Sequence, residues 1–270
     1  MSSLEIFQIA ASGLNVGNQQ MLAISNDVAN AQTHGYKSVR VDQESAFPLY
    51  FDEALSEYQA GGDTAGSLEE HKAEVGSGVR VAGTTRNFKQ GTIDVTNREL
   101  DLAIEGRGFF TIRTPDGQLR LTRNGVFSKS IDGTLVNTSG YQLDPPVRIP
   151  DNTTALSIDK NGRVIVQINN QLDQSEIGQI QLATVPNEEG LVEIGQNSFI
   201  TTPASGEAKF ETPGQEGTGV INQFALEFSN VDLISSMTKM VIQQRTFEVQ
   251  TKIIQTAERM LSNAVEIARS

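Results

Sequence analysis

The sequence predicts an α+β protein, in which a long N-terminal helix and a long C-terminal helix flank a central all-β, hairpin-rich domain. Both ends carry apolar residues that repeat every seven positions, the spacing of a helix that packs along another helix. Between the ends the apolar period changes to two and turn motifs recur, which is typical of antiparallel strands. With 270 residues, 37% of them hydrophobic, the chain is long enough to bury a core.

The first helix is predicted from about Ser3 to Ala29. Gly13 and Gly17 lie inside it, and each costs about 1 kcal/mol relative to alanine. They indicate either close approach of a neighbouring backbone or a frayed helix. Two apolar columns, offset by three residues, form one seam; they consist of Phe7, Leu14, Met21 and Val28, and of Ala10, Gly17, Ile24 and Ala31.

The closing helix is predicted from the capping residues Ser229 to Asp232 up to about Ala268. Its apolar column holds the same seven-residue spacing over six repeats: Leu233, Met240, Phe247, Ile254, Leu261 and Ala268. Apolar seams of this length need a partner that covers them. The partner can be the other terminus, another copy of the chain, or both.

Residues 38–78 differ in character and predict an extended arm with a flexible centre. The apolar run Phe47, Pro48, Leu49, Tyr50 and Phe51 is followed by a glycine-rich stretch at 61–67. A long surface loop is the plainer alternative. Because long loops without structure are uncommon unless they are functional or disordered, the apolar run indicates docking onto another surface.

Residues 79–228 predict the β domain, between an N-terminal helical segment at 1–37 and a C-terminal one at 229–270. Hairpin turns are expected at Pro115-Asp116-Gly117, Asn124-Gly125, Asp132-Gly133, Ser139-Gly140 and Asn161-Gly162. Residues 202–219 are rich in Gly, Pro, Thr and Ser and predict a surface loop. The alternation of Phe224, Leu226 and Phe228 predicts one last strand.

Composition excludes several classes of protein. The net charge of −12 disfavours nucleic acid as a partner. The arginine group Arg113, Arg120 and Arg123 is expected to point outward from a hairpin. Cysteine is absent, so disulfides and thiolate chemistry are excluded. No apolar run predicts membrane insertion, and the segment from Met1 to Leu14 lacks the basic start of a cleaved signal.

No catalytic, metal or cofactor-binding site is predicted, so the sequence does not indicate an enzyme. His34 and His71 are not spaced with other ligands. Asp101 and Glu105 are expected to be solvated at strand ends. Gly106-Arg107-Gly108 lacks the third glycine of a dinucleotide-binding turn and opens into a strand.

Three groups of motifs resemble the bacterial flagellar rod and hook family, and together they span the chain. The N-terminal group is Ser25, Asn26, Asp27, Val28, Ala29 and Asn30, followed by Thr33, Gly35, Tyr36 and Lys37; Asp27 and Val28 stand where the family usually has Asn and Leu. The middle group centres on Gly106, Arg107, Gly108, Phe109 and Phe110. The C-terminal group includes Ser229, Asn230, Val231 and Arg245.

The resemblance implies a structural subunit of the flagellar basal-body rod that polymerises with itself into a stiff hollow tube and transmits torque from motor to hook. It implies that the N- and C-terminal helices pair as a coiled coil that lines the inner tube, with the β domain as the outer layer. The apolar run at 47–51 is then the candidate for contacts between neighbouring subunits. It also implies contacts with other rod, hook and ring proteins, and export by the flagellar type III apparatus into the periplasmic space without a cleaved signal. The distal rod is favoured. A proximal rod subunit and, more remotely, a soluble β-domain binding module are the alternatives.

If the chain is a rod subunit, the polar residues Gln244, Thr251 and Glu258 can be interpreted in two ways. They lie beside the apolar column of the closing helix. They can fix the register of a helix seam at some cost in stability, or they can face the wet lumen of a tube.

Overall fold

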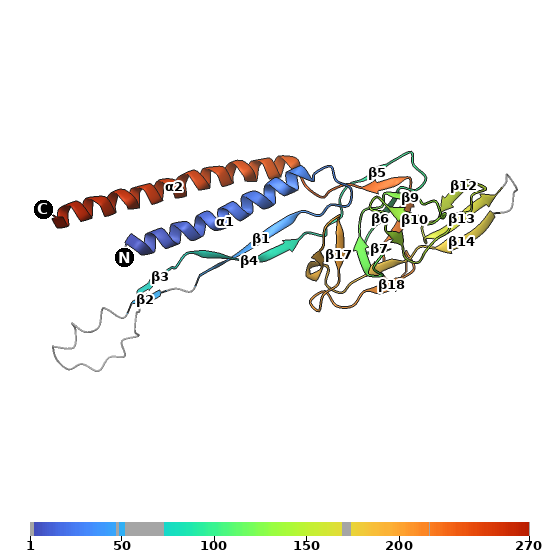
Figure 1. Ribbon diagram of the computed structural model, residues 1–270, viewed down its shortest axis with the longest axis horizontal. Helices are drawn as coiled ribbons and strands as arrows, with labels where there is room; N and C mark the ends of the chain where they lie inside the picture. The colour runs from blue at the N-terminus through green and yellow to red at the C-terminus, as the bar shows by residue number, and fades with distance from the viewer. Residues whose placement is uncertain (1–2, 47–48, 52–72, 169–173, 216, 270) are drawn as a thin grey trace, which may run out of the picture. The chain divides into compact units, whose positions relative to one another are not determined.

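The computed structural model describes residues 3–46, 49–51, 73–168, 174–215 and 217–269 (Figure 1). The chain forms two compact units. Unit 1 contains residues 1–25, 40–84 and 235–270, and unit 2 contains residues 26–39 and 85–234. Each unit is therefore built from segments that are distant in the sequence.

Two long helices and twenty strands make up the described fold, with one 3-10 turn, η1, at Glu188–Gly190. The helices are α1 (Ser3–Ala29) and α2 (Leu233–Arg269). The strands of the N-terminal third are β1 (Val39–Ser45), β2 (Leu49–Phe51), β3 (Ala73–Val75), β4 (Val79–Arg86) and β5 (Ile93–Val95). Those of the middle third are β6 (Leu102–Glu105), β7 (Phe109–Arg113), β8 (Leu119–Thr122), β9 (Phe127–Lys129), β10 (Leu135–Asn137), β11 (Gln142–Leu143), β12 (Thr153–Ile158) and β13 (Arg163–Ile168). The remainder are β14 (Gln174–Gln179), β15 (Leu182–Thr184), β16 (Val192–Glu193), β17 (Ser198–Ile200), β18 (Lys209–Glu211), β19 (Val220–Gln223) and β20 (Ala225–Glu227).

Unit 1 combines α1 and α2 with two pairs of strands. Strand β1 pairs with β4, and β2 pairs antiparallel with β3. The two helices run in opposite directions, as Figure 1 shows for the blue and red ribbons. The predicted bounds of both helices are confirmed to within a few residues. Of the predicted arm at 38–78, the described residues form β1, β2 and β3, and residues 52–72 lie outside the described part.

Unit 2 is almost entirely β. Its nine-stranded sheet follows the order β16-β17-β8-β7-β11-β10-β9, with β15 pairing to β7 and β18 pairing to β15. Strands β12, β13 and β14 form a separate antiparallel sheet, while β19 pairs with β6 and β20 with β5. One core cluster contains residues of the nine-stranded sheet, the three-stranded sheet and the β19–β6 pair: Leu102, Ile104, Phe110, Ile112, Phe127, Leu135, Leu143, Val147, Ile149, Leu156, Ile158, Val164, Val166, Ile180, Leu182 and Ile221.

Four of the five predicted hairpin turns are confirmed. The turns that contain Gly117, Gly133, Gly140 and Gly162 all connect paired neighbouring strands. The prediction for Asn124-Gly125 is wrong, because β8 pairs with β7 and β17 while β9 pairs with β10. Gly125 instead lies against Leu102, where an added Cβ would be 1.6 Å from the carbonyl oxygen of Leu102. This glycine allows a close crossing of two backbones.

Two further predictions need correction. The predicted loop at 202–219 contains β18, which pairs with β15 and extends the large sheet. The predicted strand through Phe224 is two strands, because Phe224 has φ 58° and separates β19 from β20. The Phe224 side chain is 38% exposed, whereas Leu226 is buried. Alternation in the sequence does not reveal a left-handed residue between two short strands.

Candidate functional site

The face of α2 that is covered within unit 1 combines two columns. Ser236 and Ala257 are buried, and Gln243 and Gln250 are half-buried; these four residues share a seven-residue spacing. The predicted column lies beside them: Met240, Ile254 and Leu261 are half-buried, whereas Leu233 and Phe247 are exposed. On α1 the predicted residues Phe7, Leu14, Met21, Ile24 and Val28 are all half-buried. Their role in a polymer interface stays a prediction.

Glutamine side chains of α2 lie against the two glycines of α1. A Cβ added to Gly13 would be 2.8 Å from Nε2 of Gln250, and one added to Gly17 would be 2.6 Å from Nε2 of Gln243. The prediction of a neighbouring backbone at these glycines is therefore wrong, because the nearest atoms belong to glutamine side chains of α2. Another face of α1 meets the strands, since the Val79 amide donates a hydrogen bond to Oγ of Ser12 (3.2 Å).

Much of the remaining surface of α2 is apolar and exposed. Its large apolar side chains that are at least 42% exposed are Leu233, Ile234, Met237, Val241, Ile242, Phe247, Val249, Ile253, Met260, Val265 and Ile267. They occur on several faces of the helix and not on one stripe. A helix with apolar residues on most of its surface is normally buried by neighbours.

The arm residues are only partly described. Leu49, Tyr50 and Phe51 form β2, which pairs with Val75, Glu74 and Ala73 of β3. Phe47 and Pro48 lie outside the described residues. Contacts of this apolar run with neighbouring subunits therefore stay a prediction.

Family-motif residues that are far apart in the sequence meet inside unit 2. Lys37 and Glu227 are fully buried, with Lys37 Nζ 2.6 Å from Glu227 Oε1. Lys37 Nζ also donates to the carbonyl oxygen of Lys89 (2.8 Å), and the Gly91 amide donates to Glu227 Oε1 (2.9 Å). Burial lowers the pKa of Lys37, while the charge of Glu227 opposes that change.

Arg123 completes this group and corrects a prediction. It is 3% exposed rather than pointing outward, and its Nη1 lies 3.3 Å from Glu227 Oε2. Its Nη2 donates to the carbonyl oxygen of Gly106 (2.8 Å), and its guanidinium lies 5.3 Å from the ring centroid of Phe109. Burial lowers the pKa of Arg123. We call Lys37, Arg123 and Glu227 the buried charge cluster.

Two neighbours of Lys37 are also fixed. The Gly35 amide donates to the carbonyl oxygen of Glu227 (2.8 Å), and Gly35 has φ 69°. The hydroxyl of Tyr36 donates to Oδ1 of Asp27 (2.9 Å), which also accepts from the Val39 amide (3.1 Å). Burial, followed by the charge of Asp27 and this hydrogen bond, raises the pKa of Tyr36 to about 12.

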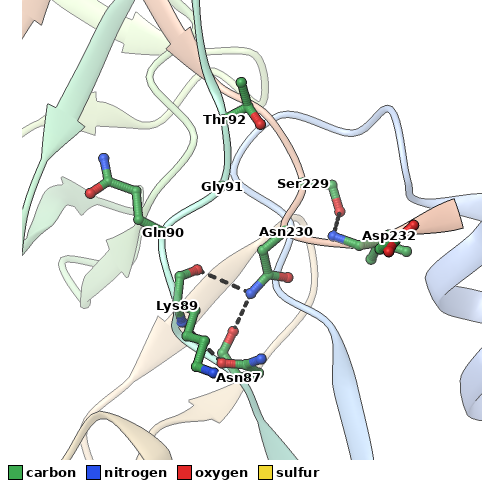
Figure 2. Close-up of a pocket in the computed structure, with 9 residues that line it drawn as sticks. Asn87, Lys89, Gln90, Gly91, Thr92, Ser229, Asn230 and Asp232 are labelled. Atoms are coloured by element: carbon green, nitrogen blue, oxygen red, sulfur yellow. Dashed lines mark hydrogen bonds between the residues drawn. The ribbon is translucent and has the colours of Figure 1, made fainter. Parts of the chain in front are cut away.

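Asn230 bridges three segments of unit 2. Its Oδ1 accepts from the Ser38 amide (2.8 Å), and its Nδ2 donates to the carbonyl oxygens of Asn87 (2.7 Å) and Lys89 (3.0 Å). Figure 2 shows the last two bonds in a shallow pocket between residues 87–92 and 229–232. The buried Ser229 accepts from the Val231 amide (3.2 Å) at the approach to α2. The side-chain amide of Asn230 lines this pocket, and its oxygen and nitrogen are already used in the hydrogen bonds that connect these segments.

The other motif residues have different surroundings. Asn30 donates to Oδ1 (2.6 Å) and to the carbonyl oxygen (2.9 Å) of Asn26 at the end of α1. Gly106 and Gly108 have φ 108° and 127°, which suits glycine. The remaining motif residues differ in burial. Phe109 and Phe110 are fully buried, whereas Ser25 and Ala29 are exposed. Arg245 is also exposed and forms an ion pair with Glu248.

Asp101 corrects a further prediction, since it is buried rather than solvated. It is 1% exposed and accepts a hydrogen bond from Thr96 Oγ1 (2.9 Å). Glu105 is exposed, as expected. Among the described residues, Asp101 contacts Thr96 and Glu105 contacts Asn222, so the two carboxylates do not form an acid–base pair with each other.

Sequence reasoning missed Asp27, Arg123 and Glu227 as functional residues. The signal for Glu227 was available, because a carboxylate between Leu226 and Phe228 interrupts an apolar strand. A buried charge needs a partner, and the motif cation Lys37 was a candidate. The position of Asp27, where the family usually has Asn, was a second signal.

Metal-ligating side chains do not cluster in the described part of the chain. No group of three or more His, Asp or Glu residues there could hold a metal ion. The ring of His34 packs edge-on against Phe228 with centroids 4.8 Å apart, and His71 lies outside the described residues. Among the described residues, neither helix has the length and apolarity that crossing a membrane requires.

Comparisons with known proteins identify the family. The flagellar hook protein FlgE/F/G D1 domain matches residues 103–166, and the flagellar basal body rod FlgEFG protein C-terminal region matches residues 222–267. The chain is 38% identical to the flagellar basal-body rod protein FlgG of Caulobacter vibrioides, over 96% of this chain and 97% of that protein. It is 33% identical to FlgG of Bacillus subtilis, over 96% and 97%. The flagellar hook protein FlgE of Escherichia coli is 36% identical over 51% of this chain and 28% of its own length. The chain therefore belongs to the flagellar basal-body rod and hook protein family.

Proposed function

We propose that this chain is a structural subunit of the distal flagellar rod and that it polymerises with copies of itself into a stiff hollow tube. The observation that carries the proposal is the apolar surface of α2, which one chain leaves exposed on several faces. Similarity to FlgG rod proteins over nearly the whole chain supports the distal rod over the proximal one.

In this proposal, α1 and α2 pair as an antiparallel coiled coil that forms the inner wall. The glutamine contacts at Gly13 and Gly17 support the pairing. The apolar residues that stay exposed, including Ile253, Met260 and Ile267, would then pack against helices of neighbouring copies. A wall of close-packed helices resists sliding and bending, so it can transmit torque from motor to hook.

The same family membership supports the cellular setting. We place the subunit in the rod within the periplasmic space, in contact with other rod, hook and ring proteins. We also propose that the subunit is exported by the flagellar type III apparatus without a cleaved signal. The role is structural and needs no catalytic group or cofactor.

The arm at 38–78 is proposed to contact neighbouring subunits, with the apolar run at 47–51 as its anchor. Deleting residues 47–51 should soften or disassemble the polymer while unit 2 stays folded. Bending stiffness of the polymers in electron micrographs measures the effect. Polymers of unchanged stiffness after the deletion would refute this role.

The central test changes the exposed face of α2. Ile253, Met260 and Ile267 are replaced by serine in the full chain, and light scattering is recorded against concentration with and without purified basal bodies as templates. Burial of such side chains contributes about 1.5–3 kcal/mol each. Only the exposed parts of these side chains, 46%, 61% and 76%, are left for assembly to bury. The threshold concentration for polymer growth should therefore rise about a hundredfold or more, with helix content unchanged in circular dichroism.

Ile131→Ser is the matched control, because Ile131 is fully exposed but belongs to unit 2. It should leave the threshold within about twofold. A wild-type chain that stays monomeric even with templates, or a triple variant that polymerises normally, contradicts the proposal. The first outcome would favour a soluble binding module.

A further inference from the structure

The seam between α1 and α2 contains two glutamine amides at places where an apolar seam would have aliphatic side chains. We call Gly13, Gly17, Gln243 and Gln250 the glutamine–glycine seam. The two glycines are four residues apart on one face of α1, and the two glutamines are seven apart on α2. A Cβ added to Gly13 would lie 2.8 Å from Nε2 of Gln250, and one added to Gly17 would lie 2.6 Å from Nε2 of Gln243, so the amides leave no room for a side chain at either position. The glycines thus form notches that the amides fill.

A second feature shows that strength alone does not explain this seam. Oε1 of Gln250 is buried and accepts no hydrogen bond from any described residue. A buried acceptor without a donor lowers stability, so an apolar side chain of similar length would hold the helices together more strongly. Polar residues at a helix seam can instead select one register and one partner, because the wrong arrangement leaves them without their fitting surroundings.

The spacing of the four residues permits one alignment. If α2 slides by seven residues in one direction, Gly17 faces Gln250 and Gln243 loses its notch. If it slides the other way, Gly13 faces Gln243 and Gln250 loses its notch. Either slide forces one amide against a residue with a side chain. We infer that Gln243 and Gln250 are register-determining residues, which align α2 on α1 of the same chain before neighbouring copies add.

This inference rests on the proposed function. If the two helices were misaligned, the exposed apolar residues of α2 would be shifted along the helix axis and would not meet their partners on the next copy. The inference assigns the selection of register to Gln243 and Gln250. The sequence pattern pointed instead to Gln244, Thr251 and Glu258. Gln244 and Glu258 are exposed and Thr251 donates its hydroxyl to the carbonyl oxygen of Phe247 (2.9 Å), so all three leave the notches unfilled.

The test measures register in the full-length monomer. The chain contains no cysteine, so Asn18→Cys and Lys252→Cys, both at exposed positions, allow two spin labels to be attached specifically. Pulsed electron paramagnetic resonance then gives the distance between α1 and α2. A slide of seven residues moves one label by about 10 Å along the helix axis, which is well resolved.

The wild-type seam should give one narrow distance distribution. Replacing Gln243 and Gln250 together by methionine, which has similar length and no amide, should raise the slipped fraction about tenfold. Gly13→Ala with Gly17→Ala should do the same by filling the notches. The matched control replaces the exposed Gln244 and Gln255 by methionine and should leave the distribution unchanged.

An unchanged distribution in both seam variants, or equal broadening in the control, would overturn the inference. The measurement is made at a concentration where light scattering shows monomer, so it does not depend on polymer growth. A narrow register in a chain that never polymerises would reject the proposed function and leave the register assignment in place.

Discussion

Lys37 and Glu227 form a buried ion pair at 2.6 Å, although 190 residues separate them in the sequence. Glu227 also faces Arg123, so one carboxylate stands between two buried cations. The pair joins the segment that follows α1 to the strand that precedes α2. Unit 2 is therefore closed by its first and last segments, and Lys37 is neutralised only when both are in place.

We predict that Glu227→Gln strongly destabilises unit 2. The substitution keeps the shape but leaves Lys37 and Arg123 as neighbouring buried cations without an anion. Removing one partner from a buried charged group costs about 3–5 kcal/mol. Urea denaturation of the full chain, followed by circular dichroism in the β region, measures the change.

Glu248→Gln is the control for this prediction. Glu248 accepts from Arg245 at 3.0 Å, but both side chains are more than half exposed. Exposed pairs contribute about 0–1 kcal/mol. If the two variants lost similar free energy of unfolding, the burial of Glu227 would not explain its contribution to stability.

We predict an unusual alkaline titration for Tyr36. Its pKa is raised to about 12 from the ordinary tyrosine value of 10.0, first by burial and then by the charge of Asp27. Between these values the folded chain holds a proton that the unfolded chain has lost. This contribution to stability is therefore complete below pH 10 and is lost as the pH rises towards 12.

Ultraviolet absorbance of the phenolate measures this titration. Tyr36 should ionise about two pH units above the ordinary tyrosine value, and Tyr36→Phe should remove that late step. Tyr141→Phe should preserve it. A late step that survives in Tyr36→Phe would assign the raised pKa to another residue.

The sequence predicted the elements whose patterns are local. Both helices follow from the seven-residue repeat, and the hairpin of β12 and β13 follows from the alternation of Leu156 and Ile158 with Val164 and Val166. Gly125 was misassigned because a turn and a close backbone crossing both favour glycine. Nothing local in the sequence distinguishes them.

The candidate sites were predictable only in part. The apolar columns marked the helices, but the covered face of α2 also uses Gln243 and Gln250, whose partners are glycines of a distant segment. Arg123 was expected to be exposed because hairpin alternation is a local rule. Its burial depends on Glu227, 104 residues away.

We predict that Asn230→Asp weakens the link between three segments of unit 2. The carboxylate can still accept from the Ser38 amide, but it cannot donate to the carbonyl oxygens of Asn87 and Lys89. Loss of both bonds, with carbonyls facing a charge, should cost about 2–3 kcal/mol of unfolding free energy.

Asn187→Asp is the control, since Asn187 donates one exposed bond to the carbonyl oxygen of Ala204 (3.1 Å). It should cost about 0.5 kcal/mol. Hydrogen exchange at the Ser38 amide gives a local readout, which should accelerate in Asn230→Asp and not in the control. Equal exchange rates in the two variants would contradict a bridging role.

Finally, we predict that Gly35→Ala is far more damaging than the same change at Gly140. Both glycines have positive φ, 69° and 80°, so alanine brings about 1–2 kcal/mol of backbone strain at either position. Around Gly140 an added Cβ meets nothing within 4 Å. At Gly35 it would lie 2.6 Å from the Asn124 amide nitrogen and 2.7 Å from the carbonyl carbon of Arg123, and backbone at that distance cannot yield cheaply. Gly35→Ala must push this segment away from the buried charge cluster, which weakens the bond from the Gly35 amide to Glu227. We expect a loss of at least about 3 kcal/mol, against about 1–2 kcal/mol for Gly140→Ala, in urea denaturation of the full chain. Equal losses would mean that conformational strain alone accounts for Gly35, and that the segment after α1 is not held tightly against the strand that carries Arg123.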